Sequence, residues 1–214
     1  NTQRLKKKDY ENREDFARVF DESINIISQE VEGMKDLLNE FLRFSRMPTP
    51  DPQPISLHKI IDDILISYSE HEKNIQIKKS LDPNLAQLTI DPEQIRRVLI
   101  NLFENATDAI DEGGIIQITT KILEGKKWIR IEFSDNGAGI SSSDREKLFL
   151  PHFTTKKRGT GLGLAIVNRI IIDHNGTIKV QDNYPKGTKF IIDLPYSQAT
   201  LKTDKTLPKS FSRI

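Results

Sequence analysis

The sequence predicts an α+β fold: a two-layer α/β sandwich in which helices cover one face of a single sheet, preceded by a long helix of a dimeric helical bundle. Three observations lead to this prediction. Helix-like and strand-like segments alternate without an internal repeat between residues 55 and 195. A heptad pattern of apolar residues occupies the chain before a proline-rich stretch. Hydrophobic residues make up 36% of the 214 residues, which permits a packed core.

The first 47 residues contain a helix with one apolar stripe. Its apolar positions follow one another at alternating steps of four and three: Phe20, Ile24, Ile27, Val31, Met34, Leu38 and Phe41. This spacing places them on one side of a helix, and a lone helix cannot bury such a stripe. We therefore expect residues 1–47 to be part of a helical dimerisation region that forms a homodimer. The alternative is an amphipathic helix that folds back on its own domain.

A proline-rich segment separates this region from the rest of the chain. Residues 48–54 carry proline at every second position. Proline blocks helix and favours an extended polyproline conformation, so we expect a semi-rigid linker and a domain boundary here. Residues 55–195 then form the second domain. Residues 196–214 are polar and lack periodicity, so they are expected to be a disordered tail.

Hydrophobic periodicity and turn residues predict the elements of the second domain in order. Asp91 and Pro92 are the strongest boundary signal, because they suit the N-cap and the first turn of a helix. The expected elements are helices over 57–69, 91–110 and 161–173, and strands over 75–81, 86–90, 115–123, 128–134, 177–181 and 188–194.

The composition limits the classes of function. The net charge of +1 offers no electrostatic case for a nucleic-acid partner. The absence of cysteine excludes disulfides and thiolate metal sites. No apolar run approaches the roughly 20 residues that cross a bilayer, and no signal peptide opens the chain. Because the chain starts on Asn1, we interpret it as a cytoplasmic fragment of a longer protein, with any membrane anchor in absent upstream segments.

The helix expected after Asp91 carries the first candidate motif. Asn101, Asn105 and Asp108 are spaced i, i+4 and i+7, so they share one face of that helix. Buried polar side chains need partners, and a metal ion with phosphate oxygens would supply them. The alternative is an ordinary solvated helix face.

The second motif is Asp135-Asn-Gly-Ala-Gly-Ile140, directly after an expected strand. An aspartate at a strand end can accept a hydrogen bond from an exocyclic amine, such as that of adenine. Gly137 and Gly139 permit a tight turn and a close approach of the backbone to a ligand. The alternative is a simple strand-to-loop turn.

The third and fourth motifs suit an anionic ligand. Lys156, Lys157 and Arg158 follow two threonine hydroxyls, although a run of charges is also typical of a solvated loop. The segment Gly159-Thr-Gly-Leu-Gly-Leu164 then opens a helix, where exposed N–H groups and the helix dipole favour phosphate. It lacks the lysine of a P-loop and the spacing of a dinucleotide fingerprint.

In this order and spacing, the four motifs resemble the N, G1, F and G2 boxes of the GHKL superfamily, which includes histidine kinases and gyrase. The resemblance covers residues 55–195 and implies the Bergerat ATP-binding fold. The closing Gly187-Thr-Lys-Phe190 is similar to the end of a histidine kinase domain. The segment EFLRFSRMP before the linker resembles the second dimerisation helix of sensor kinases of the nitrogen-regulation (Ntr) type.

The resemblance implies a pocket for ATP and Mg²⁺. Asn105 would bind Mg²⁺ next to the ATP phosphates, with Asn101 and Asp108 beside it, and Asp135 would bind the adenine amino group. The implied nucleotide-binding residues are Asn101, Asn105, Asp108, Asp135, Gly137, Gly139, Ile140, Phe153, Thr155, Lys156, Arg158, Gly159, Thr160, Gly161, Leu162, Gly163 and Thr188.

The resemblance also implies a mobile lid over ATP, formed by residues 141–160. Lys156, Arg158 and the amides of Gly161–Gly163 would hold the phosphates, and Thr188 would support the adenine. The implied activity is that of a two-component signal-transduction transferase. It would pass the γ-phosphate of ATP to a histidine, and the phosphate would then move to an aspartate on the receiver domain of a response regulator.

The phosphate-accepting histidine of the family is missing. Its H box pairs a histidine with a following acidic residue and a later proline, and none of His58, His71, His152 and His174 fits that pattern. Residues 1–8 resemble the end of the helix that would carry it. We therefore expect the acceptor to lie outside this chain, and we assign no catalytic residue within it.

The sequence is also compatible with two other functions. A GHKL-type ATPase uses a glutamate one helical turn before the magnesium-binding asparagine, where this chain has Asn101, and Glu104 is expected to point about 100° away from Asn105. A non-catalytic module that binds nucleotide and dimerises is the other alternative.

Overall fold

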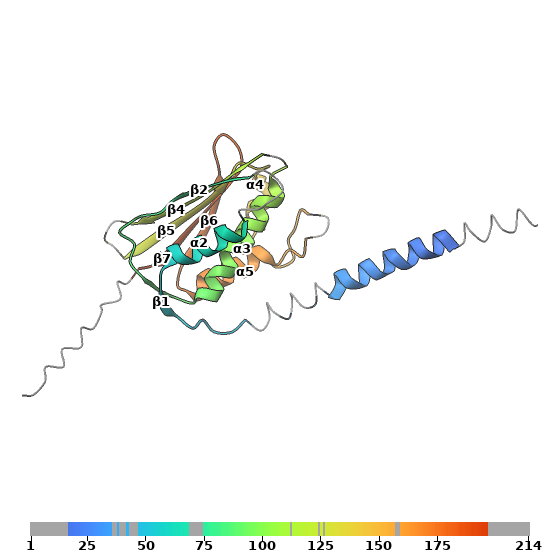
Figure 1. Ribbon diagram of the computed structural model, residues 1–214, viewed down its shortest axis with the longest axis horizontal. Coiled ribbons are helices and arrows are strands. Elements are labelled where there is room, and N and C mark those ends of the chain that lie inside the picture. Colours follow the sequence, from blue (N-terminus) through green and yellow to red (C-terminus); the bar gives the residue numbers. More distant parts are fainter. Residues whose placement is uncertain are drawn as a thin grey trace, which may run out of the picture.

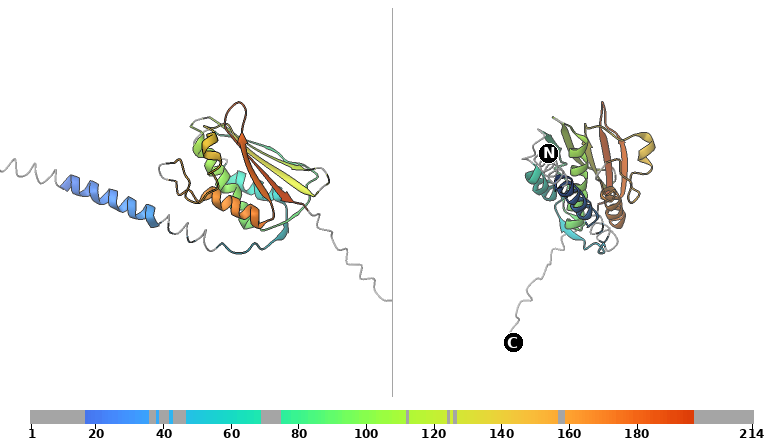
Figure 2. Two further views of the ribbon diagram at one scale, coloured as in Figure 1. Left: turned by 180° about the vertical axis from the view of Figure 1, so that it is seen from behind. Right: turned by 90° about the vertical axis from the view of Figure 1, so that its right-hand side faces the viewer.

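The structure, a computed structural model, describes residues 17–35, 38, 42, 47–68, 75–111, 113–123, 125, 127–156 and 159–196. From residue 47 onward, the described chain forms two layers, with a sheet on one side and helices on the other (Figures 1 and 2). This arrangement confirms the predicted α+β class.

The predicted N-terminal helix is helical over residues 17–35. Its apolar stripe is exposed in the single chain: the side chains of Phe20, Ile24, Ile27, Val31, Met34 and Leu38 are 46–67% exposed. Phe41, also part of the expected stripe, lies outside the described residues, as do residues 1–16. The homodimer remains a prediction.

The main sheet has five strands in the order β2-β4-β5-β7-β6. They are β2 (Gln76–Ser80), β4 (Ile115–Ile122), β5 (Trp128–Asp135), β6 (Thr177–Asp182) and β7 (Thr188–Pro195). The strands β2 and β4 run parallel, and the other neighbours are antiparallel. Side chains alternate between the two faces, so Ile129, Ile131 and Phe133 of β5 enter the core while Arg130 pairs with Asp193 on the other face.

The prediction of one sheet was wrong, because Leu88–Ile90 leaves the main sheet. This strand, β3, pairs antiparallel with β1 (Gln53–Ile55) in a separate two-stranded sheet. Two residues of the expected linker, Gln53 and Pro54, are thus part of a strand. The linker residue just before β1 is also fixed to the domain, because the Asp51 N–H donates to Asp91 Oδ2 at 3.0 Å.

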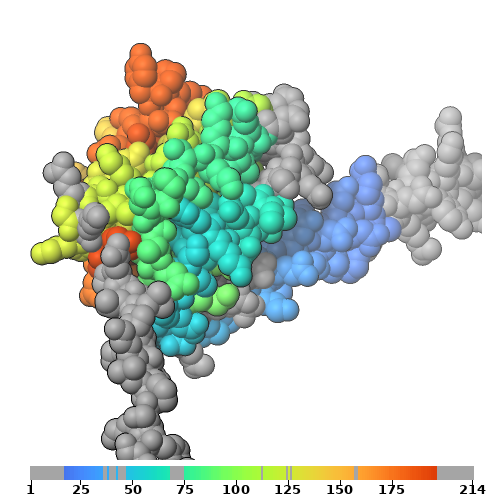
Figure 3. All heavy atoms as spheres, turned by 60° about the vertical axis from the view of Figure 1, so that its left-hand side comes forward, coloured from blue at the N-terminus to red at the C-terminus, as the bar shows by residue number. Residues whose placement is uncertain are grey.

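Three helices cover one face of the sheet: α2 (Leu57–Tyr68), α3 (Pro92–Ala109) and α5 (Gly163–Asp173). The helix α3 packs against both of the others. The helix α2 lies at the surface, where its teal atoms are visible in Figure 3. The core between the layers includes an edge-to-face pair of Phe103 and Phe133, whose ring centroids are 4.9 Å apart. No described helix is both long enough and apolar enough to cross a membrane.

The ends of α3 and α5 depend on particular residues. Asp91 caps α3 as predicted, because Oδ1 accepts hydrogen bonds from the N–H groups of Glu93 and Gln94. The helix α5 begins at Gly163 rather than at the predicted Gly161. With φ of +68°, Gly161 has a left-handed conformation that cannot be part of a right-handed helix. A short helix that was not predicted, α4 (Ser142–Arg145), begins after the cap residue Ser141.

Candidate functional site

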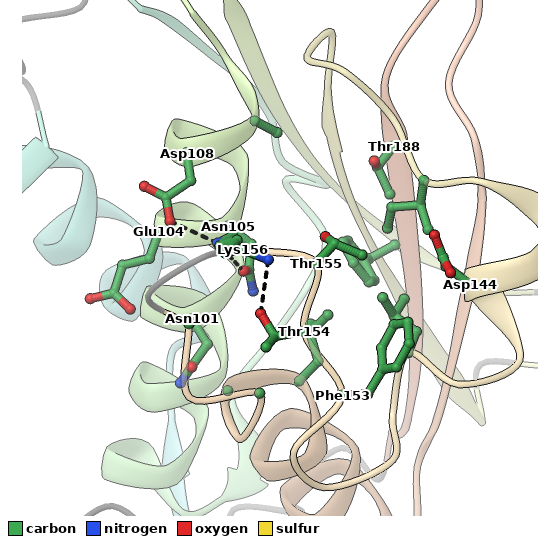
Figure 4. Close-up of a pocket in the computed structure, with 18 of the residues that line it drawn as sticks. Asn101, Glu104, Asn105, Asp108, Asp144, Phe153, Thr154, Thr155, Lys156 and Thr188 are labelled. Carbon is green, nitrogen blue, oxygen red and sulfur yellow. Dashed lines mark hydrogen bonds and ion pairs between the residues drawn. The ribbon is translucent and has the colours of Figure 1, made fainter. Parts of the chain in front are cut away.

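A cavity of about 570 Å³ opens between α3, the start of α5, the lid segment and the strands β5 and β7 (Figure 4). Its lining combines polar side chains from α3 with backbone and apolar groups from the other elements. The lining residues are Asn101, Glu104, Asn105, Asp108, Ala109, Asp135, Gly139, Ile140, Ser141, Asp144, Leu148, Phe153, Thr154, Thr155, Lys156, Gly159, Thr160, Gly161, Gly163, Leu164, Thr188 and Phe190.

The polar face of α3 forms one wall of the cavity. Asn101, Asn105 and Asp108 all line it, as their helical spacing predicted. The amide of Asn101 donates from Nδ2 to the carbonyl of Arg97 at 2.9 Å, which fixes its orientation. A Cβ at Gly163 would lie 2.6 Å from Asn101 Oδ1, so a larger residue at that position would force the Asn101 side chain to move.

The lid places a cation against the same wall. Lys156 Nζ donates to Asn105 Oδ1 at 2.9 Å and to Asp108 Oδ2 at 2.7 Å (Figure 4). The backbone N–H of Lys156 donates in turn to Thr154 Oγ1 at 3.1 Å. Lys157 and Arg158 lie outside the described residues, so the predicted role of Arg158 stays a prediction.

A buried carboxyl group lies at the other end of the cavity. The side chain of Asp135 is the last of β5, and the residue is only 3% exposed. Its Oδ1 accepts hydrogen bonds from the N–H groups of Gly137 at 2.8 Å and Thr188 at 3.3 Å. Burial raises the pKa of Asp135 above its ordinary value, while the two backbone hydrogen bonds act in the opposite direction.

Close backbone packing holds this carboxyl in place. Gly187 has φ of +112°, and a Cβ there would lie 2.0 Å from the carbonyl oxygen of Asp135. The same carbonyl accepts a hydrogen bond from Asn183 Nδ2 at 2.7 Å. The turn between β6 and β7 is thus packed directly against the end of β5, which is why Gly187 is needed there.

The start of α5 offers backbone N–H groups to the cavity. Leu162 occupies the cap position, and no side chain among the described residues caps this helix. Gly161, Gly163 and Leu164 line the cavity at this end. The first N–H groups and the positive end of an 11-residue helix suit an anion.

Most of the predicted residues gather in this cavity, and a few do not. Gly137 and Leu162 lie behind the lining: Gly137 donates to Asp135, while Leu162 is fully buried in the core. The lining residues that were not among the predicted nucleotide-binding residues are Glu104, Ala109, Ser141, Asp144, Leu148, Thr154, Leu164 and Phe190. The alternation of β7 could have identified Phe190, which shares a strand face with Thr188.

Glu104 is the missed residue with the greatest chemical consequence. The sequence suggested that its side chain points away from the Asn105 face of α3, and Figure 4 shows the Glu104 carboxylate directed away from Asn105 and Lys156, although the residue contributes to the lining. This carboxylate could act as a base on a bound water molecule only if its side chain turned toward the cavity.

The arrangement as a whole suits a ligand with two chemically different ends. The buried carboxyl of Asp135 can accept a hydrogen bond from an amine, next to the apolar side chains of Ile140 and Phe190. The opposite end supplies the ammonium of Lys156 and the N-terminus of α5, which suit negative charge. An adenine nucleotide has both of these ends.

Comparison with known proteins agrees with this geometry. Residues 90–198 match the family described as histidine kinase-, DNA gyrase B- and HSP90-like ATPases. The sensor histidine kinase ZraS of Escherichia coli (strain K12) is 32% identical over 172 residues, which are 79% of this chain and 37% of ZraS. The chain therefore spans little more than a third of the length of this curated relative.

Two solved structures are similar in fold as well as sequence. The catalytic domain of histidine kinase ThkA is 33% identical with a TM-score of 0.61, and the match covers 68% of this chain and 96% of that domain. The complex of ThkA with the response regulator protein TrrA contains a chain that is 29% identical with a TM-score of 0.67. That match covers 81% of this chain and 50% of the other.

Proposed function

The chain belongs to the histidine kinase-, DNA gyrase B- and HSP90-like ATPases, as a catalytic domain of the sensor histidine kinase type, and on this premise we propose that its cavity binds Mg²⁺-ATP for phosphoryl transfer. The acceptor would be a histidine outside this chain. From there the phosphate would pass to an aspartate on the receiver domain of a response regulator.

One observation carries the nucleotide assignment. Asp135 is a buried carboxylate whose Oδ1 accepts both hydrogen bonds that described residues donate to it, which leaves Oδ2 for a ligand. A buried acceptor of this kind selects a base that presents an amine, as adenine does, and rejects guanine, which presents a carbonyl oxygen at the equivalent position. Thr188 would then support the base from β7.

The α3 wall fits a divalent cation. The Asn105 amide oxygen and the Asp108 carboxylate already accept hydrogen bonds from a cation, the ammonium of Lys156. Hard oxygen ligands of this type are those that Mg²⁺ prefers. Asn105 would hold the ion, with Asn101 and Asp108 nearby, and the bound ion would neutralise negative charge on the phosphates.

The proposed role of this domain in the transfer is to orient the nucleotide and neutralise its charge. Lys156 and the N–H groups of Gly161–Gly163 would fix the phosphates, and Asp135 would fix the base, so that the terminal phosphate faces an incoming histidine nitrogen. The P–O bond to ADP breaks as the P–N bond to histidine forms. The similarity to ThkA in its complex with a response regulator supports the proposed receiver-domain partner.

Hydrolysis of ATP is a second candidate, because Glu104 lines the cavity. It would require Glu104 to activate water, a role that Asn101 cannot perform because an amide is a poor base.

One experiment separates these functions. The chain is extended at its N-terminus with an acceptor-histidine helix of a sensor kinase and incubated with Mg²⁺ and ATP labelled at the γ-phosphate. Acid-labile phosphohistidine that disappears when the acceptor is changed to glutamine would support the kinase. Release of free phosphate alone, abolished by Glu104→Gln, would favour hydrolysis. Bound but unconverted ATP would indicate a non-catalytic module.

A further inference from the structure

The ammonium of Lys156 lies where the α3 wall would bind a metal ion. It donates to Asn105 Oδ1 at 2.9 Å and to Asp108 Oδ2 at 2.7 Å, two oxygens that lie one helical turn apart. Lys156 comes from the lid, 51 residues along the chain from Asn105. The contact therefore joins the lid to the helix that carries the proposed metal ligand.

The backbone of the lid aims this side chain at α3. The Lys156 N–H donates to Thr154 Oγ1, and the Lys156 carbonyl accepts from the Gly159 N–H at 3.3 Å. The base of the lid is also constrained, because a Cβ at Gly161 would lie 2.5 Å from the His152 backbone. These contacts fix the backbone of Lys156, from which the side chain extends to α3.

A lysine ammonium and a divalent cation cannot use the same oxygens together. Both are positive, and both need the lone pairs of the Asn105 amide. Bound phosphate groups would change this balance, because they offer the ammonium a stronger anionic partner than a half-exposed aspartate.

We propose that Lys156 is an internal substitute for the metal ion, occupying the Asn105–Asp108 site in the nucleotide-free protein and leaving it when phosphate arrives. The inference rests on the proposed function and extends it to the order of binding. Free divalent cations compete poorly with the tethered ammonium, so the metal enters together with the nucleotide. The exchange also releases the lid from α3 and allows Lys156 to bind phosphate.

The test measures Mn²⁺ binding by electron paramagnetic resonance, with and without ADP, in the full chain. Lys156→Gln removes the ammonium. Lys147→Gln is the matched control, since Lys147 is an exposed lysine of the same segment with no hydrogen bond or ion pair to α3 among the described residues. Without nucleotide, Lys156→Gln is expected to bind Mn²⁺ about fivefold more tightly than the wild type, because about fivefold is the largest change that losing a half-exposed ion pair would give. The Mn²⁺ affinity of Lys147→Gln should change little. Asn105→Ala added to Lys156→Gln should remove the gain.

A second readout follows the lid without any metal. Hydrogen exchange at the amide of Gly159, which donates to the carbonyl of residue 156, is expected to be faster in Lys156→Gln than in Lys147→Gln. Equal Mn²⁺ affinity and equal exchange in the two variants would overturn the inference. In that case the proposed function would still be supported if ADP strengthened Mn²⁺ binding to the wild type. Failure of ADP to bind any form would instead contradict the proposed function.

Discussion

The backbone N–H of Thr188 donates to Oδ1 of Asp135 at 3.3 Å, although the two residues are 53 positions apart. This bond joins the start of β7 to the end of β5 at the cavity. Together with the N–H of Gly137, it fixes the carboxyl so that Oδ2 remains for a ligand. The orientation of the proposed base-binding group is therefore set by the sheet itself.

Asp135→Asn is expected to weaken ATP binding by more than tenfold. A hydrogen bond to a charged acceptor contributes about 1.5–3 kcal/mol, and the amide can present an N–H to the adenine amine instead. Calorimetric titration measures the change. Asp144→Asn is the control, because Asp144 lines the same cavity without being buried. Equal affinity of wild type and Asp135→Asn would contradict the adenine assignment.

The same substitution is expected to stabilise the nucleotide-free protein at neutral pH. Burial raises the folded-state pKa of Asp135 above the ordinary 3.8, so the folded state binds its proton more tightly than the unfolded chain. Stability therefore falls as the pH rises from 3.8 through the raised pKa, and this loss is complete above it. Thermal unfolding should show a higher Tm for Asp135→Asn at pH 7, with the difference shrinking toward pH 3.8. A difference that grows on acidification would contradict this cause.

Gly187→Ala is expected to destabilise the domain by about 2–4 kcal/mol, because the new Cβ combines a strained backbone with a clash against Asp135. Gly125→Ala separates these causes: Gly125 has φ of +81°, but a Cβ added there would meet nothing within 4 Å. Urea denaturation should show a clearly smaller loss for Gly125→Ala. Equal losses would mean that close packing at Gly187 is unimportant.

His174→Ala is expected to cost about 1–3 kcal/mol of unfolding free energy. His174 Nδ1 lies 2.8 Å from the Ile170 carbonyl, so it carries the proton, and Nε2 accepts from the Asp91 N–H at 3.0 Å. The alanine variant leaves that buried N–H without its acceptor. Gln94→Ala, which removes an exposed hydrogen bond to Pro48 at the same junction, should cost much less. If both variants lost a similar amount of unfolding free energy, the buried hydrogen bond between His174 and Asp91 would not be the cause.

Local signals in the sequence predicted the parts of the fold that depend on neighbouring residues. Asp91 and Pro92 marked the start of α3, since a cap acts within one turn of its helix. The spacing of Asn101, Asn105 and Asp108 predicted one wall of the cavity, because helical geometry alone places them on one face.

Contacts between distant segments could not be predicted in this way. The pairing of β1 with β3 brings the proline-rich segment against residues 88–90, and nothing in either segment specifies the other. The ion pair of Lys156 with Asp108 likewise depends on how the lid folds over α3. The glycine motif was expected to open the helix at Gly161, whereas the left-handed φ of that residue is visible only in the fold.

Binding of Mg²⁺-ATP in this cavity underlies every functional proposal made for the chain. A calorimetric titration with ATP, with and without Mg²⁺ and with GTP as the comparison, tests it directly. We expect ATP binding that strengthens with Mg²⁺, and little or no binding of GTP. Absence of adenine nucleotide binding to the folded chain, or equal binding of ATP and GTP, would contradict the assignment of the cavity.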